Sequence, residues 1–319
     1  MSTTSRYRLP MRYPLVPGRH IPASHKRQHH FSALRMSTNA LKTAIVLSGL
    51  GGLLVFVGSL FGQAGAVIGL AFGLLVAGGS YWFSDALAIR AAGAIPVSER
   101  EMPEYHHIVA ELCADAGLPM PRLYVTPDLQ PNAFATGRNP HHAAVAVTRG
   151  ILDLLTWDEL RGVIAHELSH IGNRDILLSS VAAAVATGIS FLANLAMWVP
   201  FFGPSSDEES STNPLGLFVA ALLAPLAAGL LQLALSRSRE FEADATGAEL
   251  VGDGAALARA LAKLDRAARA LPMELDPAQA AKYIVNPLTG SRASFAKLFM
   301  THPPVEERIT RLTGGRSRR

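Results

Sequence analysis

The segment His166-Glu167-Leu-Ser-His170 has the H-E-x-x-H spacing that points most directly to chemistry in this chain. Residues four apart on a helix lie on one face, so both imidazoles can bind the same metal ion. The Glu167 carboxylate would then lie beside the metal, where it can act as a general base toward water. The spacing predicts a zinc hydrolase; the alternative is two histidines on a helix that bind no metal.

The sequence around this motif predicts the helix that must position it. Thr156 and Glu159 have the spacing of a capping box, which satisfies backbone N–H groups at a helix start. An apolar stripe with helical period follows the cap. It consists of Leu160, Val163, Ile164, Leu168 and Ile171.

Catalytic zinc sites usually have three protein ligands, so a third donor is expected elsewhere in the chain. The best candidate is the acidic run at 236–244. On a helix, Glu240 and Asp244 share one face, and Glu242 points nearly the opposite way. One of the two carboxylates could bind the metal while the other accepts the remaining N–H of a ligand histidine. The spacing alone equally allows a solvated charged helix.

These motifs resemble those of the HtpX-type membrane zinc metalloproteases, which are related to the type I CAAX prenyl proteases. The resemblance extends over residues 36–312 and is carried by the stretches 96–101, 131–140, 166–175, 239–244 and 301–309. It implies one zinc ion per subunit, bound by His166, His170 and Glu240. It also implies that Glu167 is catalytic and that Asp244 supports a ligand histidine.

Two further regions have candidate roles. His302 could stabilise the oxyanion of a tetrahedral intermediate, or it could simply lie at a helix start. The resemblance suggests that one strand lies near the substrate cleft, where an edge strand can pair with an extended peptide; an ordinary sheet strand is the alternative. The residues of this strand are Asn132, Ala133, Phe134, Ala135, Thr136 and Gly137.

Composition and charge distribution predict a membrane protein. The chain is 49% hydrophobic and only 17% charged, with a mean hydropathy of +0.24. Residues 43–84 contain no charged residue and no histidine, and as one helix they would be about 63 Å long, twice the hydrocarbon thickness. We therefore expect two spans joined by a turn at 62–65. Charge-free runs at 176–206 and 210–236 predict a second hairpin.

The loop charges predict the orientation of these spans. Residues 1–35 contain seven Lys or Arg and no acidic residue, and both hairpin turns lack Lys and Arg. By the positive-inside rule, the N-terminus and the protease domain face the cytoplasm. The expected organisation is a basic, disordered extension (1–35), two membrane hairpins (36–84 and 176–236) and a protease domain in two parts. These parts are 85–175, with the metal-binding helix, and 237–319, with the third ligand.

The expected fold is a mainly α membrane protein with four transmembrane helices. Its cytoplasmic α+β domain is expected to be zincin-like (gluzincin), with a small antiparallel sheet. Hydrophobic patterns predict helices at 101–116 and 255–271 and a last helix starting near Pro303. They predict strands at 122–126, 132–136 and 143–148, with a turn at 137–140.

The function most consistent with these features is a zinc endopeptidase of the bacterial inner membrane. The resemblance implies that it cleaves misfolded or damaged membrane proteins during stress. The expected partners are polypeptides and the lipid bilayer, with no nucleic acid or nucleotide. Two alternatives are a CAAX-type prenyl-protein protease and a non-catalytic membrane scaffold with a structural zinc. The four spans contain no ionisable residue, which argues against ion transport.

Overall fold

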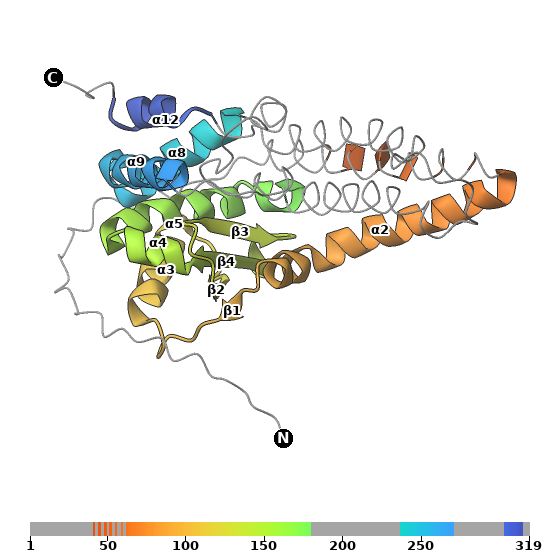
Figure 1. The fold of residues 1–319 in the computed structure, drawn as a ribbon, viewed down its shortest axis with the longest axis horizontal. Helices are drawn as coiled ribbons and strands as arrows, with labels where there is room; N and C mark the ends of the chain where they lie inside the picture. Colours follow the sequence, from red (N-terminus) through yellow and green to blue (C-terminus); the bar gives the residue numbers. More distant parts are fainter. Residues whose placement is uncertain are drawn as a thin grey trace, which may run out of the picture.

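The computed structural model describes residues 62–179, 237–270 and 303–314, together with separate positions between 41 and 59. A four-stranded sheet lies at the centre of the described part, in the order β1-β2-β4-β3. Its strands are β1 (Ile95–Pro96), β2 (Arg122–Thr126), β3 (Ala133–Gly137) and β4 (Ala143–Thr148). Figure 1 shows the sheet between a group of helices and the C-terminal end of the long helix α2 (Gly62–Ala91).

The sheet is mixed, so the prediction of an antiparallel sheet is wrong for one strand pair. β3 and β4 form an antiparallel hairpin, but β2 pairs with β4 in parallel. All six residues of β4, Ala-Ala-Val-Ala-Val-Thr, are buried. A strand that is apolar on both faces belongs inside a sheet. Therefore β4 lies next to β2, and β3 is left at the edge.

The two faces of β4 contribute to two different apolar clusters. Val145 and Val147 point into the main core, together with residues of α3 (Pro103–Ala116) and α5 (Trp157–Gly172). Ala144 and Ala146 point the other way and pack with Ile89 near the end of α2. This alternation explains why β4 requires cover on both faces.

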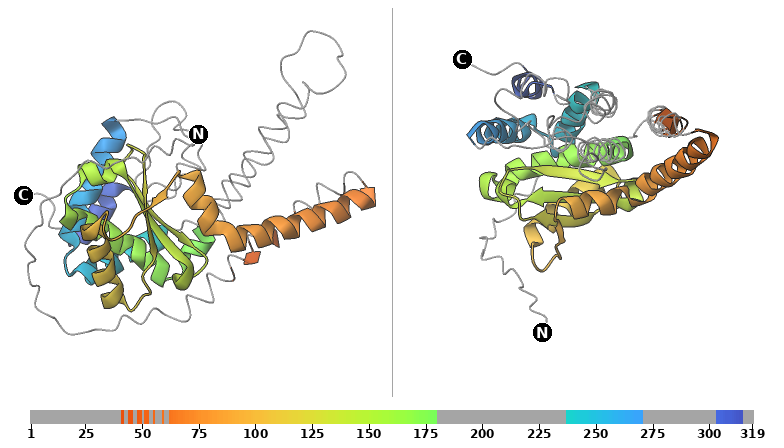
Figure 2. Two further views of the ribbon diagram at one scale, coloured as in Figure 1. Left: turned by 90° about the horizontal axis from the view of Figure 1, so that it is seen from below. Right: turned by 45° about the vertical axis from the view of Figure 1, so that its right-hand side comes forward.

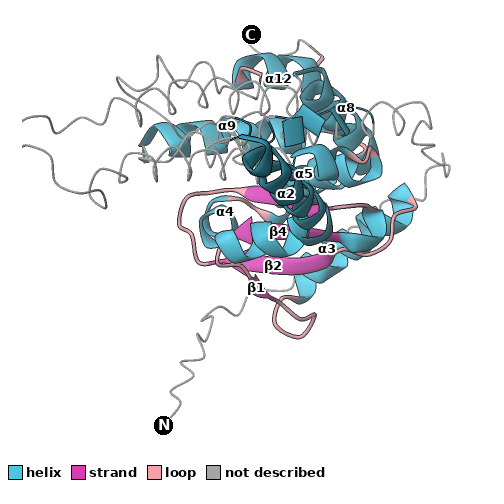
Figure 3. Cartoon of the chain, turned by 90° about the vertical axis from the view of Figure 1, so that its right-hand side faces the viewer, coloured by secondary structure: helices cyan, strands magenta, loops and turns pink. Residues whose placement is uncertain are grey.

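The helices α5, α8 (Arg237–Val251), α9 (Gly254–Ala270) and α12 (Val305–Leu312) gather on one side of the sheet (Figure 3). The short helices η1 (Pro140–His142) and α4 (Arg149–Leu154) flank β4. α5 packs against α8, α9, α3 and β3, so it is the central helix of the domain. Residues far apart in the sequence thereby meet around one helix.

Helix α2 extends away from the body formed by the sheet and the other helices, as both views of Figure 2 show. It begins at Gly62, so residues 62–65, the expected turn, already belong to this helix. Among the described residues, no helix combines the length and apolarity that a membrane crossing requires. The extension 1–35 and nearly all of the second predicted hairpin lie outside the described residues.

Most predicted elements of the protease domain are present. Strands 122–126 and 143–148 have the predicted bounds, and the edge strand is shifted by one residue. Helix α3 begins at Pro103, two residues later than predicted, and α9 begins and ends one residue earlier than predicted. The two-residue strand β1 was not predicted, because Ile-Pro is too short to show a period.

Candidate active site

Helix α5 holds the H-E-x-x-H motif and is fixed at its start by the predicted capping box. Thr156 Oγ1 accepts from the Glu159 N–H, and Glu159 Oε2 accepts from the Thr156 N–H, at 3.3 and 2.9 Å. The whole predicted apolar stripe is buried. His166 and Glu167 are buried as well, so this helix has little solvent contact around the motif.

Helix α8 crosses α5 next to His166 and brings a third donor. The crossing is close because α8 has a glycine at the contact. A Cβ built at Gly247 would lie 2.9 Å from the backbone N of His166. Only glycine permits this approach, which sets how near α8 comes to the motif.

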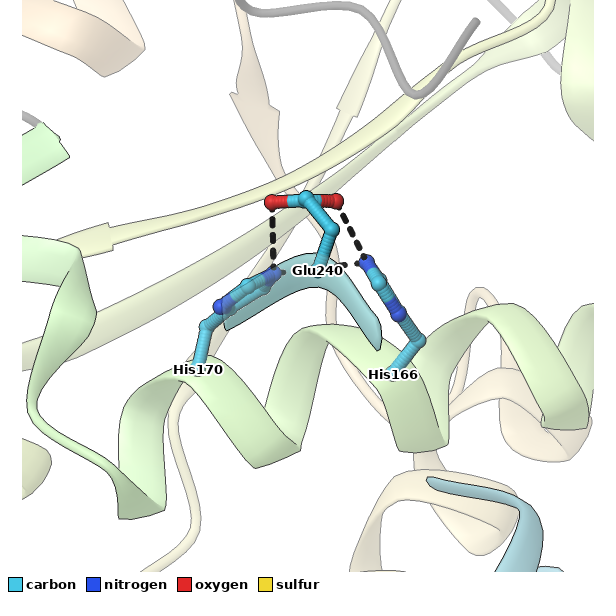
Figure 4. Close-up of side chains that lie close together, drawn as sticks. All are labelled: His166, His170 and Glu240. Carbon is cyan, nitrogen blue, oxygen red and sulfur yellow. Dashed lines mark hydrogen bonds and ion pairs between the residues drawn. The ribbon is translucent and has the colours of Figure 1, made fainter. Parts of the chain in front are cut away.

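The side chains of His166, His170 and Glu240 converge between these two helices, as Figure 4 shows. One ligand atom from each residue can be chosen so that all lie within 4.8 Å of one another. The two Nε2 atoms are 3.3 Å apart, and each lies 3.6 Å from one oxygen of the Glu240 carboxylate. Two imidazole nitrogens and a carboxylate that face one point form a set of donors suited to a divalent metal.

The other ring nitrogen of His166 faces a carboxylate. Asp244 Oδ1 lies 2.9 Å from His166 Nδ1, and Asp244 also accepts two hydrogen bonds from Arg308. Burial alone would raise the pKa of Asp244, but the bonds from Arg308 and His166 outweigh it and lower the pKa to about 2. The Asp244 carboxylate at Nδ1 fixes the orientation of the His166 ring, with Nε2 toward Glu240.

His170 has an equivalent arrangement. Asp175 Oδ2 lies 3.3 Å from His170 Nδ1, and Arg239 Nη1 lies 3.8 Å from the other oxygen of Asp175. Burial lowers the pKa of His170, but the hydrogen bond with Asp175 and the charges of Glu240 and Glu167 outweigh it and raise the pKa to about 9. The carboxylates around this ring therefore favour positive charge at the point where the three donors meet.

The carboxylate of Glu167 is held by the edge strand. The Ala135 N–H donates to Glu167 Oε2 at 2.8 Å. Buried Tyr105 donates from its hydroxyl to the carbonyl of Val145, the residue paired with Ala135, at 3.3 Å. The pKa of Tyr105 is raised by burial and by the charge of Glu167. The motif helix and the edge strand are thus joined directly at the candidate general base.

Comparison with known proteins decides the family. The family model described as Peptidase family M48 matches residues 99–315. The chain belongs to peptidase family M48. It is 50% identical over 277 residues to a protein named "Protease HtpX homolog" of Pelotomaculum thermopropionicum, covering 86% of this chain and 98% of that protein. It is 48% identical over 274 residues to the "Protease HtpX homolog" of Pyrococcus furiosus, covering 85% and 94%.

Among solved structures, a similarity at a lower level is found. The similarity is to the crystal structure of S. mikatae Ste24p, with a TM-score of 0.47 and 18% identity over 88% of this chain and 67% of that chain. The predicted resemblance to HtpX-type proteases is confirmed by the M48 match and by the relatives that are about half identical. The predicted enzyme class, a metalloprotease, is confirmed with it.

The predicted site residues are distributed as follows in this M48 domain. His166, His170, Glu240, Glu167 and Asp244 are brought together, and the predicted cleft strand forms β3 beside Glu167. Asn132 directly precedes β3, and its backbone N–H donates to Thr148 Oγ1. His302 lies outside the described residues.

Sequence reasoning missed three residues of the site, namely Asp175, Arg239 and Arg308. The two arginines lie inside stretches on which the family resemblance rests, 239–244 and 301–309, and Asp175 ends the stretch 166–175. Each is buried despite its charge. A charge inside a family motif could have indicated them, because buried charges require partners.

Proposed function

We propose that this chain is a zinc-dependent endopeptidase of the membrane whose zinc is held by His166, His170 and Glu240. The observation that carries the proposal is the buried convergence of these three donors beside Glu167, which the edge strand holds through Ala135. Two imidazoles and one carboxylate match the ligand set of catalytic zinc sites that keep one position open.

The surroundings of the donors support a cation at this point. Asp244 and Asp175 lie against the Nδ1 atoms of the two histidines, so both Nε2 atoms face Glu240. Two ring nitrogens 3.3 Å apart in a buried site are stabilised by a shared positive charge. When bound here, zinc supplies Lewis acidity, which polarises the substrate carbonyl and makes water more acidic.

Glu167 is the proposed general base. Its carboxylate lies on the same helix as the two histidines, and the Ala135 N–H holds one of its oxygens at 2.8 Å. In this role Glu167 accepts a proton from the attacking water and returns it to the leaving amine. The fixed orientation reduces the entropy that the carboxylate must lose in the transition state.

The proposed substrates are polypeptides that lie along β3. The Thr148 N–H donates to the Asn132 carbonyl, so Asn132 and Thr148 form a hydrogen-bonded pair of the antiparallel ladder. Such pairs alternate along a strand, so the backbone groups of Phe134 and Thr136 also bond toward β4. The backbone groups of Ala133 and Gly137 and the carbonyl of Ala135 then face the outer edge, where the Ala135 N–H donates to Glu167. Pairing with this edge gives affinity that depends little on the substrate sequence, as a protease of damaged proteins requires.

The proposed setting is the cytoplasmic face of the bacterial inner membrane. In this proposal the protein has four membrane spans, in hairpins at 36–84 and 176–236, and its protease domain consists of the parts 85–175 and 237–319. The charge-free run starting at Ile176 lies four residues after the end of α5, and α8 begins at Arg237, directly after the run that ends at Ser236. This proximity supports misfolded or damaged membrane proteins as clients.

Reporter enzymes fused at positions 62–65 and 207–209 test the topology. A reporter that is active only in the periplasm should be active at both positions, because both hairpin turns lie outside the cytoplasm in this proposal.

The Glu167→Gln variant tests the catalytic proposal. Gln keeps an oxygen for the Ala135 N–H but cannot act as a base, so casein cleavage should fall about 10²–10⁴-fold. Zinc content, measured on the same purified protein, should stay at one ion per chain. Glu306→Gln, at an exposed glutamate of α12, is the matched control and should cleave normally. Normal cleavage by Glu167→Gln would reject the proposal.

A further inference from the structure

The far end of the edge strand is attached to helix α2. Arg138, the residue directly after β3, lies over the ring of Trp82 with its guanidinium carbon 4.9 Å from the ring centroid. The same guanidinium donates to the Trp82 carbonyl at 3.3 Å. On the neighbouring part of the sheet, Arg122 of β2 forms an ion pair with Asp85 of α2. The sheet that contains this strand is therefore attached to α2 at Trp82 and Asp85.

In the proposed topology, the sequence around Trp82 marks this part of α2 as the membrane boundary. The charge-free run 43–84 ends two residues after Trp82, and Asp85 is the first charged residue. The side chains of Trp82 and Phe83 are exposed, at 59% and 61%. Exposed aromatic residues at the end of an apolar run are typical of the headgroup region of a bilayer.

The direction of β3 relative to this boundary is fixed. The arrow of β3 points toward α2 (Figure 1), so Ala133 is at the far end of the strand, and Gly137 directly precedes Arg138, which contacts Trp82. A peptide that pairs antiparallel to β3 runs the opposite way. Its N-terminal part then passes Gly137 and Arg138, and its C-terminal part leaves past Ala133.

From this geometry we infer that the protease is selective for the topology of its clients. It cleaves cytoplasmic segments that follow a membrane span in the sequence, because the part N-terminal to the scissile bond must lie toward the bilayer. The inference rests on the proposed function and adds to it the direction in which the client chain lies in the site. Antiparallel pairing is the more stable arrangement for an added strand.

The short distance between Glu167 and the membrane boundary makes the length of chain between a client's span and its scissile bond important. Three residues separate Ala135, beside Glu167, from Arg138 at the boundary, which is about 10 Å of extended chain. A client whose scissile bond lies about five to ten residues after its span can therefore reach the site while extended. A segment that precedes a span must instead run past the site and turn back, which requires a longer linker.

Two single-span substrates with an identical cleavage cassette test this inference. In one substrate the cassette follows the span after a short linker, and in the other it precedes the span by the same linker. Flanking Lys and Arg residues keep both cassettes on the cytoplasmic side. Each is produced together with the intact full-length protease, and cleavage is followed in inverted membrane vesicles. The detached cassette peptide and the Glu167→Gln protease serve as controls.

We expect the cassette that follows the span to be cleaved at least about tenfold faster, because its linker gives the higher effective concentration at the site. Lengthening both linkers to about 30 residues should bring the two rates together. Equal rates with short linkers, or faster cleavage of the preceding cassette, would overturn the inference. If none of the substrates, including the detached peptide, is cut, the proposed endopeptidase function fails and the inference fails with it.

Discussion

Arg308 and Asp244 form a buried ion pair with two hydrogen bonds. Arg308 Nε and Nη2 donate to Asp244 Oδ2 and Oδ1 at 2.8 and 2.7 Å, and Arg308 is fully buried. Asp244 in turn lies 2.9 Å from His166 Nδ1. A residue in the last described helix, 142 positions after the histidine, thus helps to orient the histidine.

Replacing Arg308 with Met should weaken metal binding. The substitution leaves the Asp244 carboxylate buried without its main partner, which costs about 3–5 kcal/mol in comparable pairs. Loss of such support for a ligand histidine typically lowers metal affinity about 10–100-fold. Competition with a chromogenic zinc chelator measures this loss directly, independently of proteolysis.

Arg311→Met is the matched control on the same helix. Arg311 is exposed, forms an i,i+4 ion pair with Glu307, and stacks on Phe241 at 3.6 Å. Exposed pairs of this kind contribute at most about 1 kcal/mol, so zinc affinity should remain unchanged. Equal effects of the two substitutions would show that α12 acts only through general stability.

Local sequence patterns predicted the parts of this site that lie on single elements. The capping box of Thr156 and Glu159, the helical stripe after it, and the face shared by Glu240 and Asp244 follow from periods of one helix. The bounds of β2 and β4 follow from short apolar runs between turn residues.

Relationships between elements could not be predicted in this way. The pairing of Arg308 with Asp244 depends on how α12 meets α8, and no period in the sequence encodes it. The pairing of Asp175 with His170 is local but depends on the turn after α5, where Arg174 has a φ of 58°, and helical periodicity does not predict that turn. The parallel pairing of β2 with β4 was missed for a different reason. Three consecutive strands suggest a simple meander, whereas the fully buried Ala-Val run of β4 required a central position.

Replacing Gly247 with Ala should weaken both stability and zinc binding. The new Cβ would lie 2.9 Å from the backbone N of His166, and a backbone neighbour cannot rotate away. Such overpacking typically costs about 1–3 kcal/mol, and it would push Glu240 on α8 away from the histidines. Thermal unfolding and zinc competition, measured in parallel, check both effects.

Gly78→Ala provides the comparison for this glycine. A Cβ built at Gly78 meets nothing within 4 Å, so the substitution adds a methyl group without a clash. Zinc affinity should then equal that of the parent protein. A Gly247→Ala protein with unchanged melting temperature and zinc affinity would contradict the close helix crossing.

The single cysteine should be inert in the folded protein. Cys113 is buried in helix α3, and burial raises the pKa of its thiol to about 12. At pH 8 the thiolate fraction is then about 10⁻⁴, compared with about 0.2 for an unfolded thiol with a pKa of about 8.5. Iodoacetamide should therefore react roughly a thousandfold more slowly before unfolding than after it. Mass spectrometry of pulse-labelled protein measures the ratio, and rapid labelling of folded protein would contradict this burial.

Glu159 should make stability depend on pH. Burial raises the pKa of Glu159, but hydrogen bonds from Lys263 and from the Thr156 backbone outweigh it, so the pKa is lowered in the folded protein. Folding thus favours the charged form. The stabilisation is complete above the unfolded pKa of about 4.3 and is lost as the pH falls through the lower folded value.

The Glu159→Gln variant isolates this charge, because Gln can keep the capping hydrogen bond with Thr156 but cannot pair ionically with Lys263 at 2.7 Å. At pH 7 the variant should be less stable by about 1–2 kcal/mol. The difference from the parent melting temperature should shrink as the pH falls below about 4, where the parent loses its charge. Asp158→Asn, which removes an exposed partner of Arg259, should change stability by less than about 1 kcal/mol. A difference for Glu159→Gln that stays constant from pH 7 to pH 3 would show that its carboxylate charge does not contribute.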